Sequence, residues 1–233
     1  MDELDFYPCL VDGAPASIYV NLRYETQNAP DAETRYTIAV PIHDSGPHGI
    51  GTADEAELLN AWEESLIERL ALVYVGRIRN RGIWEVVFYG PAGGLESVRE
   101  AAALDDRASD VRSEFDPEWR YYRELLLPDA ERKQWMDDRR LVQILREQGD
   151  VLVSPRDVDH FLRFTNAKQR DEFIEKIAGK GFTAQPSDPE VAHVVRADSI
   201  DLDHIHDVVM ILVDAATPLG GTYERWQSAI VGA

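Results

Sequence analysis

Cysteine is almost missing from this sequence, which has Cys9 alone among 233 residues. A single thiol cannot form a disulfide within the chain, so the sequence indicates a protein of a reducing compartment. The first residues, from Met1 to Phe6, are acidic and lack the basic and then apolar order of a secretory signal. We therefore expect a cytoplasmic protein.

Long apolar runs are missing as well. The run Val208–Val213 is among the longest, and Asp214 ends it. A membrane-spanning helix needs about 20 apolar residues. The sequence therefore predicts no association with a membrane.

Positive charge is scarce. The chain has 24 Lys and Arg against 43 Asp and Glu, which gives a formal net charge of −19. Up to Pro128 there are 11 basic and 24 acidic residues, and after it 13 basic and 19 acidic, so both halves are acidic. Nucleic-acid affinity depends on basic residues that displace counterions, so we expect no direct binding of RNA or DNA. The acidic charge serves either as a solubility device or to steer the protein toward a basic protein partner.

Complete catalytic motifs are also missing. The sequence contains no G-x-S-x-G, no P-loop and no G-x-G-x-x-G, and the glycines between Gly46 and Gly51 have the wrong order and include Pro47. We therefore expect a non-enzymatic protein without a cofactor.

The first half reads as strand, strand, helix, strand, strand, helix, strand. The alternating segments Ser17–Leu22 and Tyr36–Val40 are predicted to form a hairpin, and Asn80 to Gly82 makes a second hairpin turn. Without its first strand this is the β-α-β-β-α-β order of a ferredoxin-like domain. Pro128 disfavours helix before it and marks the predicted boundary between domains 1–128 and 129–233.

The second half repeats the β-α-β-β-α-β order after a leading helix. We therefore predict an α+β protein of two tandem ferredoxin-like domains, the first with an extra N-terminal strand. In this topology the strand order is 4-1-3-2, and both helices cover one face of the sheet. The other face stays open.

Strand 157–165 alternates, with Val158, His160 and Leu162 on one side. Aromatic and arginine side chains on an open sheet face are favoured anchors for a protein partner. The alternative is that the aromatic residues pack between the domains or against the leading helix. The predicted partner-binding residues are Asp157, Asp159, Phe161, Arg163, Tyr223 and Trp226.

Histidine and aspartate residues offer a second hypothesis. The segment Asp201–Asp207 contains Asp203, His204 and His206, but its spacing does not match a zinc motif, and aspartates also favour the first turn of a helix. His160 and His193 lie on neighbouring predicted strands and could line a pocket for a small ligand or an enzyme substrate.

Several motifs in the second half resemble the regulator of ribonuclease E activity B family. They are Arg156-x-Val-Asp-His160 followed by Phe161, the pair Gly181-Phe182, and Gly221-x-Tyr-x-x-Trp226. Glu224-Arg225 departs from the Asp-Gly that is frequent in that family. The resemblance implies a ferredoxin-like domain that restrains a ribonuclease with a basic segment through protein contact, without catalysis.

The first half resembles the domain of unknown function 695 family. The residues that carry this resemblance are Ile18–Leu22, Val75-Gly-Arg77, Phe88-Tyr89 and Asp116-Pro-Glu-Trp119. That family has no assigned activity, so this resemblance implies a fold but no function.

Overall fold

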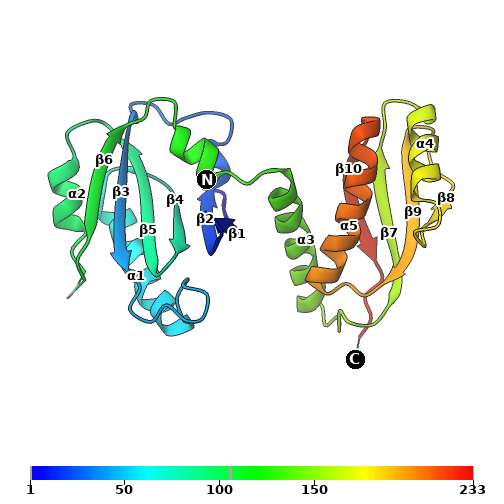
Figure 1. Ribbon diagram of the computed structural model, residues 1–233, viewed down its shortest axis with the longest axis horizontal. Helices are drawn as coiled ribbons and strands as arrows, with labels where there is room; N and C mark the ends of the chain where they lie inside the picture. Colours follow the sequence, from blue (N-terminus) through cyan, green and yellow to red (C-terminus); the bar gives the residue numbers. More distant parts are fainter. Residues whose placement is uncertain (1, 105–106, 233) are drawn as a thin grey trace. The chain divides into compact units, whose positions relative to one another are not determined.

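The computed structural model describes residues 2–104 and 107–232. The chain folds into two compact units, Met1–Asp129 and Ala130–Ala233, each with its own sheet (Figure 1). None of the helices in these described ranges has the length and apolar character needed to cross a lipid bilayer.

The first domain is built on one six-stranded antiparallel sheet. The strand order is β1-β2-β4-β5-β3-β6. Two helices, α1 (Ala53–Arg69) and α2 (Leu95–Ala101), follow strands β3 and β5. The strands are β1 (Leu4–Val11), β2 (Ala14–Asn21), β3 (Thr34–Pro41), β4 (Val73–Asn80), β5 (Ile83–Gly90) and β6 (Asp110–Phe115).

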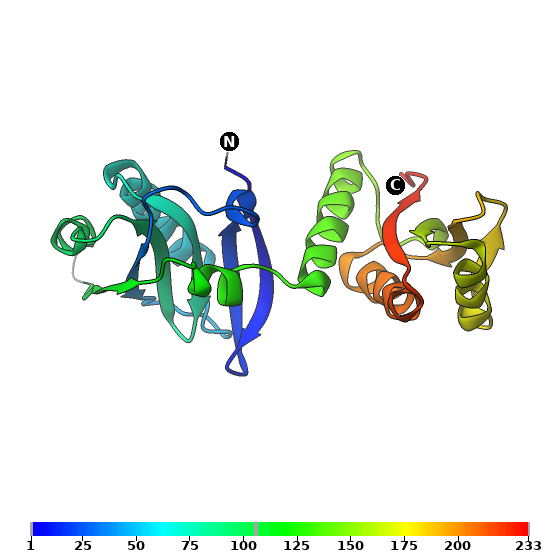
Figure 2. The ribbon, with the colours of Figure 1, turned by 90° about the horizontal axis from the view of Figure 1, so that it is seen from above.

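Four of these strands, in the order β4-β5-β3-β6, reproduce the ferredoxin-like arrangement predicted from the sequence. The hairpin predicted between Ser17–Leu22 and Tyr36–Val40 is wrong. Strand β2 instead pairs with β1 and β4, while β3 lies between β5 and β6. Figure 2 shows the β1–β2 hairpin, drawn in blue, at the edge of the sheet.

Strand β1 is not predicted from the sequence, because Pro8 lies within it. Proline cannot donate a ladder hydrogen bond, but at the edge of a sheet its missing N–H is no loss. Its connection to β2 is the pair Asp12-Gly13, and both residues have positive φ, of 48° and 75°. An Asp-Gly pair is a strong hairpin signal, so this hairpin was open to prediction.

The two faces of the first-domain sheet are covered differently. Helices α1 and α2 pack on side chains such as Trp84, Val86 and Phe88, which are fully buried. On the opposite face Trp119 stacks on Tyr89, with ring centroids 4.2 Å apart. The segment that follows Trp119 thus covers part of a face on which the described residues form no long helix.

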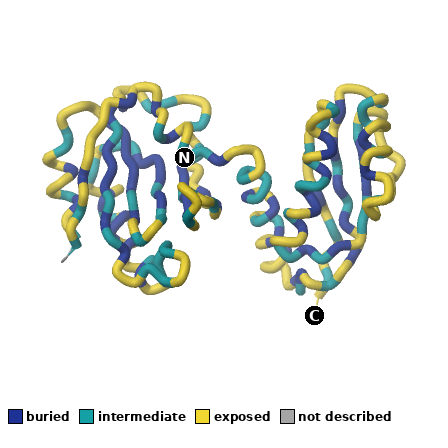
Figure 3. Tube along the Cα trace, in the orientation of Figure 1, coloured by how far each residue is buried: buried dark blue, intermediate teal, exposed yellow. Residues whose placement is uncertain are grey.

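The second domain has a four-stranded antiparallel sheet. Its order is β10-β7-β9-β8, which confirms the predicted 4-1-3-2 order. Figure 3 shows the central strands of both sheets as buried. The elements are α3 (Ala130–Glu147), β7 (Arg156–Arg163), α4 (Ala167–Ile177), β8 (Thr183–Gln185), β9 (Val191–Asp198), α5 (Leu202–Ala216) and β10 (Thr222–Ser228).

Local signals explain where the second-domain helices begin. The side chain of Asn166 accepts a hydrogen bond from the backbone N–H of Gln169, and Asp201 accepts one from His204. These side chains satisfy N–H groups that the first helical turn leaves without partners. Helix α5 then buries Ile205, and the helices gather over one face of the sheet.

Candidate functional site

Strand β7 divides its side chains between two faces of the second-domain sheet. Val158, His160 and Leu162 are fully buried beneath the helices, as the alternation predicts. The side chains between them point to the other side, on which the described residues of the domain form no helix. We call that side the open face, and its residues are Asp157, Asp159, Phe161 and Arg163 from β7, His193 and Val195 from β9, and Arg225 from β10.

Phe161 occupies the centre of the open face. The cross-strand register places it between Arg225 on β10 and His193 on β9. The imidazole of His193 stacks on the Phe161 ring with centroids 4.5 Å apart and an interplanar angle of 16°. The guanidinium of Arg225 lies 4.4 Å from the ring centroid. This geometry is favourable because an aromatic ring attracts a cation to its face.

Charged side chains surround this aromatic centre. His193 Nε2 lies 2.6 Å from Asp159 Oδ1, and Arg163 Nε lies 2.5 Å from Glu224 Oε1. Their side chains remain partly exposed, at 22% for His193 and 30% for Asp159. An aromatic and arginine centre with a polar rim is the composition of a protein-binding surface.

Tyr223 and Trp226 do not lie on the open face, so their predicted place in a partner surface is corrected. Tyr223 is opposite Leu162 and Trp226 is opposite His160, and both of these β7 residues face the helices. Trp226 is only 3% exposed. Its indole N–H donates to Asp138 on α3 at 2.9 Å, in agreement with the alternative of packing against the leading helix.

A β-bulge between Tyr223 and Arg225 causes this placement. Two residues three positions apart on a regular strand face opposite sides of a sheet. The extra residue of the bulge, Glu224, restores both Tyr223 and Trp226 to the covered face. It also turns Arg225 toward Phe161, a contact that the alternation of a regular strand does not predict.

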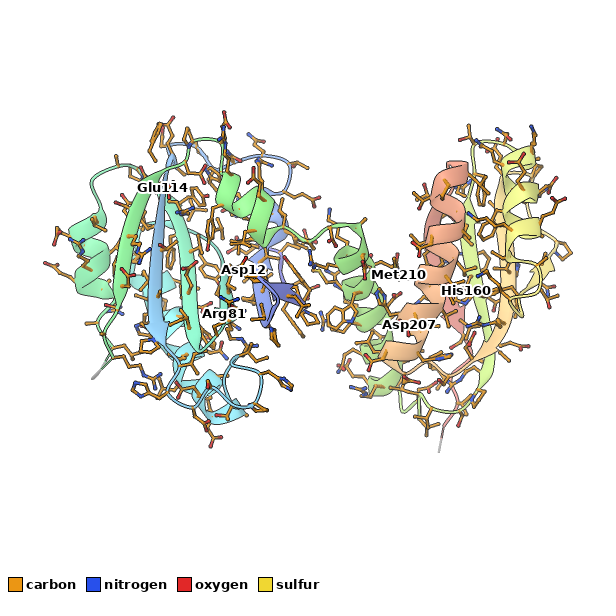
Figure 4. All side chains as sticks on the ribbon, viewed as in Figure 1. Asp12, Arg81, Glu114, His160, Asp207 and Met210 are labelled. Atoms are coloured by element: carbon orange, nitrogen blue, oxygen red, sulfur yellow. The ribbon has the colours of Figure 1, made fainter. Side chains whose placement is uncertain are left out.

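His160 is a buried structural residue beneath the helices (Figure 4). A hydrogen bond of 2.7 Å joins its Nδ1 to the hydroxyl of Tyr223, and Phe182 packs edge-on to the imidazole. Burial lowers the pKa of His160 to about 4, although Asp198 opposes the shift. The imidazole is therefore neutral near pH 7.

His160 and His193 lie on opposite faces of the sheet, because His193 is paired with Phe161 and not with His160. One pocket cannot present both imidazoles. The predicted small-ligand pocket that uses the two together is therefore wrong.

The histidines of helix α5 point away from one another. His204 Nε2 lies 2.8 Å from Asp198 Oδ1, whereas His206 Nδ1 lies 2.9 Å from Asp138 Oδ2. Burial opposes ionisation of Asp198, but hydrogen bonds from Arg196 and His204 outweigh it and lower the pKa of this carboxyl group. Among the described residues no group of three or more His, Cys, Asp or Glu side chains is arranged to hold a metal ion.

Comparison with known families gives a separate match for each domain. Residues 2–127 match the model of the Family of unknown function (DUF695), and residues 135–228 match that of Regulator of ribonuclease activity B (RraB). These matches confirm both resemblances found in the motifs. A search among curated proteins found no match. All residues of the open face lie within the second matched range.

Proposed function

The chain belongs to the Family of unknown function (DUF695) through its first domain, and we propose that it uses its second domain to restrain a ribonuclease of the E type. It acts as a non-enzymatic regulator in the cytoplasm and binds the nuclease by protein contact. The match of residues 135–228 to Regulator of ribonuclease activity B supports this assignment of partner class.

The observation that carries the proposal is the group Arg225–Phe161–His193 on the open face. Aromatic and arginine side chains dominate the binding energy of protein interfaces. Here Arg225 and His193 flank one aromatic ring; Phe161 and His193 are half-buried and Arg225 is exposed. A rigid anchor of this kind loses little conformational entropy on binding.

Charge supports a basic partner. The net charge of −19 would repel RNA but attract a basic segment of a nuclease. On the open face Asp157 is exposed at one end of β7. We propose that this carboxylate and Asp159 meet basic side chains of the partner around the Phe161 centre.

RNA cleavage by the purified ribonuclease E-type enzyme of the source organism tests this proposal. The protein is titrated into the reaction with a labelled RNA, and association with the nuclease is measured in parallel by calorimetry. We expect inhibition that weakens as salt is raised, because exposed charges are screened. A gel-shift assay with the same RNA tests whether the protein binds the RNA itself, which would also reduce cleavage.

Phe161→Ala is the decisive variant. We expect it to weaken inhibition at least about tenfold, since removal of an interface anchor costs about 2 kcal/mol or more. Glu175→Ala, an exposed change on helix α4, is the matched control and leaves inhibition unchanged. Unchanged inhibition by Phe161→Ala rejects the open face as the binding surface, and no association with the nuclease rejects the proposed partner.

A further inference from the structure

Two cavities lie on the first-domain sheet, on the face opposite helices α1 and α2. The smaller has a volume of about 270 Å³ and the larger about 410 Å³. Ile83, Glu85 and Tyr121 line both, so the two cavities adjoin. On β5, Ile83 and Glu85 alternate with Trp84 and Val86, which face the helices. We call the joined cavities the sheet groove.

The smaller cavity of the sheet groove has mainly apolar walls. Ile78 and Ile83 come from the neighbouring strands β4 and β5, and Val11 and Leu125 close the sides. Ile83 remains 41% exposed, whereas Ile78 beside it is buried. An apolar cavity with a few polar groups is the common form of a small-ligand site.

The carboxylate of Glu85 lies where the two cavities meet. Glu85 Oε1 accepts a hydrogen bond from the hydroxyl of Tyr121. Burial raises the pKa of Tyr121, and the neighbouring Glu85 raises it further, so the phenol stays a donor. Within the described part of the chain, Glu85 Oε2 makes no hydrogen bond.

The cationic side chains near the groove are already engaged. Arg35 is paired with Glu114 and lies 4.1 Å from the Tyr121 ring centroid. Arg112 is paired with Asp110 on the rim of the larger cavity. Glu85 forms no salt bridge among the described residues, and its interaction with Arg112 is a longer-range electrostatic one.

Hydrogen bonds between two hairpins fix one end of the smaller cavity, which Asn80 and Arg81 line. Arg81 Nη2 donates to the carbonyl oxygen of Asp12 at 2.7 Å, and Figure 4 shows the two residues at neighbouring tips. Asn80 Nδ2 donates to the carbonyl oxygen of Pro15 at 2.9 Å. These bonds join the β1–β2 and β4–β5 hairpins, so the cavity is formed before any ligand arrives.

We propose that the sheet groove binds a small organic cation with an apolar body. Its ammonium or guanidinium head pairs with Glu85, and its apolar body lies against Ile78, Ile83 and Leu125. A charge-assisted hydrogen bond in a half-buried site supplies the preference for a cationic head. The acidic first domain raises the local concentration of such a ligand.

Three probes with the same six-carbon body test the proposal on the full chain. They are n-hexylammonium, 1-hexanol and hexanoate, and binding is followed by shifts of the amide resonances in NMR spectra. We expect n-hexylammonium to shift the resonances of Ile83, Glu85 and Tyr121. It should bind about tenfold more tightly than 1-hexanol, and hexanoate should bind the most weakly.

Two variants test separately how the cationic head and the apolar body of the ligand contribute to binding. Glu85→Gln keeps an acceptor for Tyr121 and should abolish the preference for ammonium over alcohol. Ile83→Trp fills the smaller cavity and should abolish binding of both probes. Glu57→Gln on helix α1 is the control for general attraction to an acidic surface, because Glu57 is exposed on the other side of the sheet.

The proposal is overturned if ammonium and alcohol bind equally well. It is also overturned if the shifts caused by n-hexylammonium spread over the acidic surface and persist in Glu85→Gln. The proposal is likewise overturned if Glu57→Gln decreases the preference for ammonium over alcohol as much as Glu85→Gln does.

Discussion

The imidazole of His193 stacks on the ring of Phe161 across strands β9 and β7, with its Nε2 anchored on Asp159. The aromatic centre of the open face is thus held in place by a neighbour and not only by its own strand. This arrangement distinguishes two roles for His193, because one substitution can remove the stack and another only the anchor.

We predict that His193→Ala weakens binding of the nuclease about fivefold, since the Phe161 ring loses the neighbour that orients it. His193→Phe keeps an aromatic stack and loses only the bond to Asp159, so it should keep most of the affinity. Calorimetric titration of both variants checks this. If His193→Phe binds as weakly as His193→Ala, the bond to Asp159 and not the stack orients the surface.

Asp138 on helix α3 is a buried acceptor for three donors. It is 1% exposed and accepts from Trp226 Nε1 and Gln134 Nε2, and its Oδ2 lies 2.9 Å from His206 Nδ1. We predict that Asp138→Ala lowers the free energy of unfolding by about 3 kcal/mol, because it leaves buried donors without partners. Urea unfolding, followed through the transition of the second domain, measures this loss.

The control for this prediction is Asp207→Ala on helix α5 (Figure 4), because the side chain of Asp207 is exposed. It should change the free energy of unfolding by less than about 0.5 kcal/mol. A similar small loss for Asp138→Ala would show that the hydrogen bonds to Asp138 contribute little to the stability of the domain.

His160 makes stability depend on pH. Its pKa is about 4 in the folded chain against an ordinary value of 6.5, so between these values the unfolded chain binds more protons. The contribution of the neutral imidazole is complete above pH 6.5 and is lost as the pH falls toward 4. Between about pH 7 and about pH 4.5 this loss amounts to about 2 kcal/mol.

His160→Gln cannot titrate and can still bond to Tyr223, so it should remove this part of the pH dependence. Urea unfolding of both proteins at the two pH values gives the comparison, in which other titrating groups cancel. Parallel losses of stability in the two proteins would contradict a neutral buried His160.

Gly76 in strand β4 is a position that only glycine fits. Its φ is +147°, and a Cβ there would lie 2.3 Å from the carbonyl oxygen of Tyr19. We predict that Gly76→Ala destabilises the first domain by about 3 kcal/mol or more, because backbone must move to relieve the clash. Thermal and urea unfolding measure the effect.

Gly13 provides the matched comparison. It has a φ of +75° in the β1–β2 turn, and a Cβ at this position would meet no heavy atom of a described residue within 4 Å. Gly13→Ala therefore adds only the strain of a left-handed backbone, about 1 kcal/mol. Equal losses at Gly76 and Gly13 would mean that the contact with Tyr19 relaxes without cost.

The second-domain face was predictable because it follows from short-range rules. Alternation along β7 separates Phe161 from His160, and the β-α-β-β-α-β order of elements implies which strands are neighbours. A regular strand keeps the same alternation whatever lies around it. For β7 the prediction of a covered side and an uncovered side is therefore confirmed.

The predicted face of Tyr223 and Trp226 was wrong because a bulge changes the phase of a strand by one residue. The bulge in β10 forms where two residues share one partner position on β7, a relation between segments that lie far apart in the chain. The local sequence around Glu224 does not predict that two residues share one partner position. The contact between Arg225 and Phe161 was not predicted for the same reason, because it too depends on the bulge.

By itself the sequence determined the α+β class, the acidic character, the resemblance of each half to a known family and the alternating faces of β7, since composition, motifs and periodicity are local properties. Only the tertiary structure decided that β2 pairs with β1 and β4, that Trp226 is buried on Asp138, and that Glu85 stands in a groove. These features depend on strand register and on side chains that meet from distant segments, where the free energy of packing outweighs local preference.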